Sequence, residues 1–77
     1  MDKKEQEFRK ILGFNIKIAR LQKDITQEAL AEMAGISTKH ITKIENAGVT
    51  PNAYFVYKIA QALDVTVDEL MTEYKRK

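Results

Sequence analysis

The sequence contains no cysteine and no tryptophan, and it has only one proline, one histidine and three glycines. Without cysteine the chain forms neither a disulfide framework nor a zinc–cysteine site, so helix packing or dimerisation must stabilise so small a domain. A single histidine offers no metal-binding pair. We therefore expect neither a metal nor another cofactor.

Long apolar runs are also absent. No segment approaches the roughly 20 apolar residues that a membrane-spanning helix needs. Residues 1–7 are mostly charged and lack the apolar stretch of a signal peptide. We therefore expect a cytoplasmic protein with no membrane partner.

Size and charge narrow the function further. A chain of 77 residues forms one domain with a modest buried fraction, which leaves little room for an active-site cleft. The pattern contains no nucleotide-binding loop and no nucleophile beside a base, so we expect no enzyme and no small-molecule substrate. The formal net charge of +2 is only weakly basic, so the distribution of charge must indicate a charged partner.

The first helix is predicted from the spacing of Phe8, Leu12 and Ile16, which recur every four residues along one face. This pattern runs to about Lys23. Gly13 lies inside the pattern, where glycine costs about 1 kcal/mol relative to alanine. We expect a neighbouring helix to approach closely at this glycine.

Two short helical patterns then meet at a glycine. Thr26 can cap a second helix with its hydroxyl, and Gly35 can supply the turn that ends it. Ser37 can cap a third helix, in which Ile41 and Ile44 face inward. This arrangement is the signature of a helix-turn-helix.

The outward face of the third helix is polar and basic. Thr38, Lys39, Thr42 and Lys43 have no core to fill, and short polar and basic side chains suit the DNA major groove. Lysine can donate to guanine O6 and N7, and threonine can meet a thymine methyl group. We take Lys39 and Lys43 as the main base-reading candidates; the alternatives are phosphate contacts or a merely solvated face.

Two more helices are predicted after the third. Thr50 is expected to cap the fourth, with Pro51 at its first helical position. The run 66–69 is a capping box that starts a short fifth helix. The sequence thus predicts an all-α, five-helix domain at 11–72, preceded by an N-terminal extension at 1–10 that leads into the first helix and followed by a basic tail at 73–77.

The chain resembles the phage repressor and Cro family of helix-turn-helix proteins, also called the XRE family. The resemblance rests on Gly13, Ile16, Arg20, Thr26-Gln27-Glu28, Leu30-Ala31, Gly35, Ser37, Ile41, Ile44-Glu45-Asn46, Pro51, Ile59-Ala60 and Leu63. It implies a compact bundle of the lambda-repressor-like DNA-binding type. It also implies a transcriptional regulator, usually a repressor, that works as a homodimer on a palindromic operator.

The resemblance assigns roles to individual residues. Gln27 matches a glutamine that touches a DNA phosphate. Asn46 matches a position near the DNA backbone, and the alternative for Asn46 is that it only terminates the third helix. Arg20 and Glu45 match an ion pair that ties the first helix to the end of the third. The base-contacting positions are Ser37, Thr38, Lys39, Thr42 and Lys43.

His40 lies between the core face and the DNA face of the third helix. We expect either a surface residue or one close to a phosphate, and not a metal ligand.

Two positions depart from the family pattern. Glycine commonly follows Asn46 directly in the family, whereas this chain has Ala47 first and Gly48 second, so we expect the third helix to run one residue longer. Asp24 stands where the family often has glycine. Aspartate tolerates the left-handed conformation better than most residues, so we expect this turn to survive.

Surplus apolar residues either enlarge a thin core, as we expect for Phe55, or form a protein interface, the alternative for Tyr54 and Tyr57. Aromatic residues are enriched at interfaces, and relatives in the family often dimerise through the fourth and fifth helices. The candidate dimer residues are Tyr54, Tyr57, Val65, Val67 and Met71. The alternative function is an antitoxin or other partner-binding protein of the same fold, in which such a surface binds a toxin.

Overall fold

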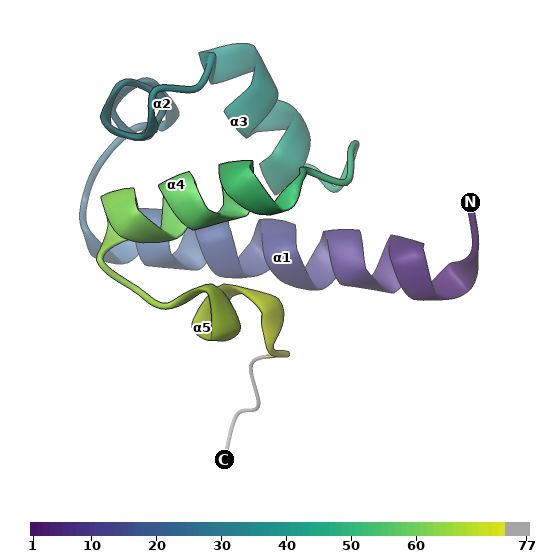
Figure 1. Cartoon of the computed structure of the whole chain (residues 1–77). Coiled ribbons are helices and arrows are strands. Elements are labelled where there is room, and N and C mark those ends of the chain that lie inside the picture. Colours follow the sequence, from purple (N-terminus) through teal and green to yellow (C-terminus); the bar gives the residue numbers. More distant parts are fainter. Residues whose placement is uncertain (74–77) are drawn as a thin grey trace.

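The computed structural model describes residues 1–73 and is built from helices packed around one core (Figure 1). The helices are α1 (Lys3–Gln22), α2 (Gln27–Ala34), α3 (Thr38–Glu45), α4 (Ala53–Leu63) and α5 (Val67–Met71). The all-α fold of five helices predicted from the sequence is confirmed. Apart from Glu73, the predicted basic tail lies outside the described residues. Within this part of the chain, no helix combines the length and the apolar character that crossing a membrane requires.

The first helix begins at Lys3, within the segment 1–10 that is predicted as an N-terminal extension leading into the helix. The Asp2 carboxylate accepts a hydrogen bond from the backbone N–H of Glu5 at 2.7 Å and caps α1 at its N-terminus. Residues 3–10 are therefore the opening turns of α1. The Thr50 hydroxyl donates to Glu5 Oε2 at 2.6 Å and accepts from Arg9 Nε at 2.7 Å, which joins these turns to the loop after α3.

The helix-turn-helix is formed by local capping, as predicted. The hydroxyl of Thr26 accepts from the N–H of Ala29 at 3.0 Å, and that of Ser37 accepts from the N–H of His40 at 3.1 Å. Gly35 adopts the left-handed conformation (φ 69°) between the two helices. These residues fix where α2 ends and α3 begins.

The predicted start of α4 is wrong. Asn52, not Thr50, is the N-cap, and its side-chain oxygen accepts from the N–H of Phe55 at 2.8 Å. The Thr50 hydroxyl instead binds Glu5 and Arg9 of α1. Pro51 consequently precedes the cap and is buried.

The predicted extension of α3 is also wrong. The helix ends at Glu45, and Ala47 itself takes the left-handed conformation (φ 61°) that glycine usually provides. The N–H of Gly48 donates to the carbonyl of Lys43 at 2.8 Å, and that of Ala47 donates to Ile44 at 3.1 Å, which completes a Schellman motif. The turn at Asp24 (φ 59°) survives as predicted.

The core joins all five helices, and α1 and α3 approach each other closely at Gly13. Its fully buried large side chains are Leu12, Ile16, Leu30, Ile41, Ile44, Ile59, Leu63 and Leu70. A Cβ added at Gly13 would lie 2.5 Å from the carbonyl oxygen of Ile44 and 2.8 Å from that of Glu45. The close approach expected at Gly13 is therefore present, and it fixes the distance between α1 and the end of α3.

Candidate nucleic-acid interface

The two sides of α3 differ sharply in burial. Ile41 and Ile44 are buried against the core, whereas Lys39 and Lys43 are exposed. Neither lysine takes part in an ion pair within residues 1–73. In Figure 1, α2 and α3 form a corner of the molecule, and α5 lies on the other side of α1 and α4. The lysines thus present two unneutralised charges on the outer face of α3.

A buried ion pair holds the inner side of α3. Arg20 Nε lies 2.7 Å from Glu45 Oε2, and Arg20 Nη2 donates to Glu45 Oε1 at 3.1 Å. The Glu45 side chain is 1% exposed. The hydrogen-bonded Glu45 carboxylate raises the pKa of the Arg20 guanidinium, which also donates to the carbonyl of Ile25 at 2.9 Å. The pair therefore ties the C-terminal part of α1 both to α3 and to the start of the helix-turn-helix.

Gln27 and Thr42, the predicted phosphate and base contacts, bind each other. The Thr42 hydroxyl donates to Gln27 Oε1 at 2.8 Å, and Gln27 Nε2 donates to Glu45 Oε1 at 3.0 Å. The hydrogen bonds continue through Glu45 to Arg20. Sequence reasoning paired Arg20 with Glu45 and gave Gln27 and Thr42 separate roles, whereas the structure joins all four residues in one network across α1, α2 and α3.

The remaining polar candidates lie at the two ends of α3. Ser37 is exposed, but its hydroxyl already caps the helix, and Thr38 is half-buried in the first turn. Asn46 is exposed at the C-terminal end, where its backbone N–H donates to the carbonyl of Thr42 at 3.0 Å. Both ends of α3 therefore offer polar side chains beside the exposed lysines.

His40 is not the free surface side chain expected from the sequence. Its ring packs edge-on against Phe55 of α4, with centroids 4.9 Å apart and an interplanar angle of 83°. Its Nε2 is buried and has no hydrogen-bond partner among residues 1–73. The ring therefore contributes to the contact between α3 and α4, a contact that the spacing within α3 does not reveal.

Sequence reasoning missed Lys58 on α4. Its Nζ donates to the carbonyl of Gly35 at 3.1 Å and lies 5.1 Å from the centroid of the Tyr54 ring and 5.4 Å from that of Phe55. A cation is favourable at the carbonyl end of a helix such as α2. The signal in the sequence is a single lysine within an otherwise mostly apolar helix.

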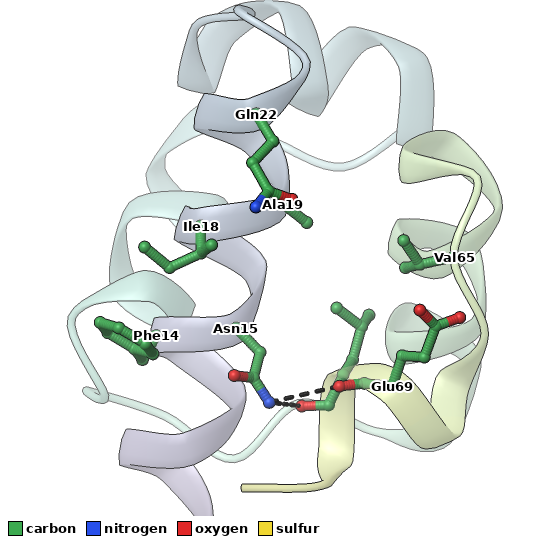
Figure 2. A pocket seen from close by; sticks show the side chains of 8 residues that line it. Phe14, Asn15, Ile18, Ala19, Gln22, Val65 and Glu69 are labelled. Carbon is green, nitrogen blue, oxygen red and sulfur yellow. Dashed lines mark hydrogen bonds between the residues drawn. The ribbon is translucent and has the colours of Figure 1, made fainter. Parts of the chain in front are cut away.

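A groove of about 380 Å³ lies along α1 where this helix packs beside Val65 and α5 (Figure 2). Phe14, Ile18 and Val65 supply apolar lining. Asn15 is the polar side chain that Figure 2 shows pointing towards α5, and its Nδ2 donates to the carbonyls of Leu70 and Thr72, both at 2.8 Å. Because the Asn15 amide already binds the end of α5, its role is structural.

The dimer candidates differ in exposure. The exposed fractions are 63% for Tyr54, 51% for Tyr57 and 44% for Met71. Val65 and Val67 are partly buried and pack against the core. The free apolar area of this set therefore comes from the two tyrosines and the methionine.

Comparisons with known proteins agree with this architecture. The family model HTH_3, a helix-turn-helix, matches residues 16–70. An uncharacterised HTH-type transcriptional regulator of Sinorhizobium fredii, y4dJ, is 33% identical over 66 residues, which cover 86% of each chain. The hypothetical transcription factor NHTF from Neisseria is similar with a TM-score of 0.85 and 28% identity over 90% of this chain and 79% of that one. The P22 c2 repressor, solved in complex with a synthetic operator, is similar with a TM-score of 0.74 and 30% identity over 78% of this chain and 91% of its own.

Proposed function

The chain belongs to the HTH_3 family of helix-turn-helix domains, and from this premise we propose that it represses transcription by binding a specific operator with α3 in the major groove. The fold is that of DNA-binding transcriptional regulators. The observation that supports operator binding most strongly is the pair of exposed lysines on a helix whose opposite side is buried. The direction of regulation is taken from the likeness to the P22 c2 repressor.

The proposed contacts divide into base reading and backbone positioning. Lys39 and Lys43 are assigned to base edges, because lysine can donate to guanine O6 and N7. Gln27 and Asn46 are assigned to the DNA backbone. Gln27 is the first residue of α2, and the free N–H groups of a helix N-terminus favour a phosphate there. Phosphate contacts set the register of the protein on the duplex, and base contacts select the sequence.

Ser37 and Thr38 are assigned secondary roles in base recognition. Both lie where α3 begins, the part of a recognition helix that usually meets base edges. The backbone N–H of His40 already donates to the Ser37 hydroxyl, which leaves the Ser37 O–H proton for an acceptor on a base. A phosphate contact by His40 is the least supported of the assignments, because its Nε2 is buried.

A homodimer on a palindromic operator is the proposed assembly. Two recognition helices related by a two-fold axis must lie about 34 Å apart to enter successive major grooves on one side of DNA. The exposed Tyr54, Tyr57 and Met71 supply apolar area for such an interface. A hydroxyl-radical footprint with two protected patches one helical turn apart would support this assembly, and a single patch would contradict it.

Binding to the DNA upstream of the protein's own coding sequence, compared with a shuffled duplex of equal length, tests the function. The expected result is preference for the upstream duplex and an affinity that falls steeply as salt rises, because phosphate contacts release counterions. Equal affinity for the two duplexes would contradict operator recognition. Capture of a small protein that covers Tyr54 and Tyr57 would then favour the partner-binding alternative.

A further inference from the structure

One chain of hydrogen bonds crosses the helix-turn-helix. Arg20 on α1 binds Glu45 at the end of α3, Glu45 accepts from Gln27 on α2, and Gln27 accepts from Thr42 on α3. Each donor–acceptor distance in this chain is between 2.7 and 3.1 Å. This series of hydrogen bonds ends at the Thr42 hydroxyl, one residue before the exposed Lys43.

Hydrogen-bond chemistry leaves one orientation for the Gln27 amide. A carboxylate paired with an arginine is ionised and only accepts, so the Gln27 atom that meets Glu45 must be the NH₂ nitrogen. The Gln27 oxygen then faces Thr42, whose hydroxyl donates to it. A hydroxyl can donate or accept. Here it must donate, because the Glu45 carboxylate fixes which end of the Gln27 amide faces Thr42.

This orientation leaves part of the Gln27 amide available. The NH₂ group has two donor hydrogens, and the Glu45 carboxylate takes one of them. Gln27 is half-buried, so solvent or a ligand can reach the remainder of its side chain. The Thr42 hydroxyl, by contrast, is already committed as a donor.

We propose that Thr42 is a positioning residue, which supports DNA binding by holding the Gln27 amide in place rather than by reading a base. This inference rests on the proposed function, in which Gln27 contacts a DNA phosphate. It also revises the role that the family resemblance gives to Thr42. Because a phosphate contact carries no sequence information, Thr42 affects the affinity for every duplex and not the choice among duplexes.

Two single substitutions separate positioning from base reading. Thr42→Val keeps the shape and a methyl group but removes the hydroxyl, whereas Thr42→Ser keeps the hydroxyl and removes the methyl group. Positioning predicts that Thr42→Val weakens binding to operator and shuffled DNA alike, by about 3- to 10-fold, the scale of one hydrogen bond. Thr42→Ser should stay within about twofold of the wild type, since the hydroxyl bond is retained.

A double-mutant cycle locates the effect in Gln27. If Thr42 acts through Gln27, then Thr42→Val should add little to the loss caused by Gln27→Ala, because coupled residues are not additive. Circular dichroism and the unfolding midpoint confirm that each variant is folded. Full additivity of the two losses in folded variants would overturn the proposal.

The opposite pattern of single substitutions would also overturn the proposal. If Thr42→Ser loses affinity, Thr42→Val keeps it, and the loss is confined to operators with one particular A·T pair, then the Thr42 methyl group reads a thymine.

Nuclear magnetic resonance of the free protein provides a readout that needs no DNA. The side-chain NH₂ resonances of Gln27 should shift in Thr42→Val and remain near their wild-type positions in Thr42→Ser. Unchanged resonances in Thr42→Val would overturn the role of Thr42. A wild type that shows no operator preference would instead overturn the proposed function, so the two failures are distinguishable.

Discussion

The inner side of α3 is buried and tightly paired, whereas its outer side is exposed and positively charged. On the inner side, Gly13 brings the α1 backbone within reach of the last α3 carbonyls, and Arg20 and Glu45 form a bidentate pair in the core. On the outer side, Lys39 and Lys43 are exposed and form no ion pair within residues 1–73. One eight-residue helix is thus fixed by packing on one side and left free to bind on the other. Substitutions on the inner side should therefore change stability, and those on the outer side should change DNA binding.

Removing Arg20 should cause the largest loss of stability among these substitutions. Arg20→Ala leaves the Glu45 carboxylate buried without its cation, which costs about 3–5 kcal/mol in the free energy of unfolding. Urea denaturation measures this loss, and DNA binding should fall mainly because the folded population falls. Replacing both partners, Arg20→Met with Glu45→Leu, should recover much of the loss because no unpaired charge remains. A folded Arg20→Ala protein of unchanged stability that binds DNA poorly would contradict this division between the two sides.

A methyl group at Gly13 should produce the next largest effect. Gly13→Ala places a Cβ against the backbone oxygens of Ile44 and Glu45, so α1 and α3 must move apart. Overpacking costs about 1–3 kcal/mol, and we expect about 2–3 kcal/mol here because the obstructing atoms are backbone oxygens; the roughly 1 kcal/mol higher helix propensity of alanine offsets part of this cost. We expect a net loss of about 1–2 kcal/mol in thermal or urea denaturation. Lys17→Ala, at an exposed position of α1, is the control and should stay within about 0.5 kcal/mol of the wild type. A Gly13→Ala protein as stable as this control would show that α1 and α3 are not in tight contact at Gly13.

The smallest predicted effect is a gain at the end of α3. Ala47 has a left-handed backbone that costs an L-residue about 1–2 kcal/mol, a cost that glycine avoids at some expense in unfolded-chain entropy. Ala47→Gly should therefore raise the free energy of unfolding by about 0.5–1 kcal/mol. Gly48→Ala should give no gain, since a Cβ there would lie 3.3 Å from the Lys43 carbonyl oxygen. Destabilisation by Ala47→Gly would refute the assignment of strain to this position.

Most of the fold follows from local sequence signals. The caps at Thr26, Ser37 and Thr66 were predictable because each hydroxyl binds an N–H only three residues away. Thr50 has the same chemistry, but its hydroxyl binds Glu5, 45 residues away, so the predicted cap is wrong. Local capping rules fail where a distant residue competes for the same hydroxyl.

The candidate site was predictable only in part, for the same reason. Helical spacing alone places Lys39 and Lys43 on the outer side of α3. The contact of His40 with Phe55 and the bond of Thr42 to Gln27 join residues from different helices, which no local pattern encodes. The sequence therefore indicates which side chains face outward, and the structure adds which of them already have partners.

The most direct test of operator recognition by α3 is a salt series of DNA binding by Lys39→Ala plus Lys43→Ala, on the upstream and shuffled duplexes. The matched control is Lys4→Ala plus Lys10→Ala, which removes the same amount of positive charge from α1. We predict that the α3 variant stays folded and loses about 10- to 100-fold of its preference for the upstream duplex, while the α1 variant keeps that preference. A uniform loss on both duplexes, with a salt slope lower by about one for each lysine, would reassign the lysines to phosphates. An α3 variant that keeps both affinity and preference would contradict the central claim that the outer side of α3 reads DNA.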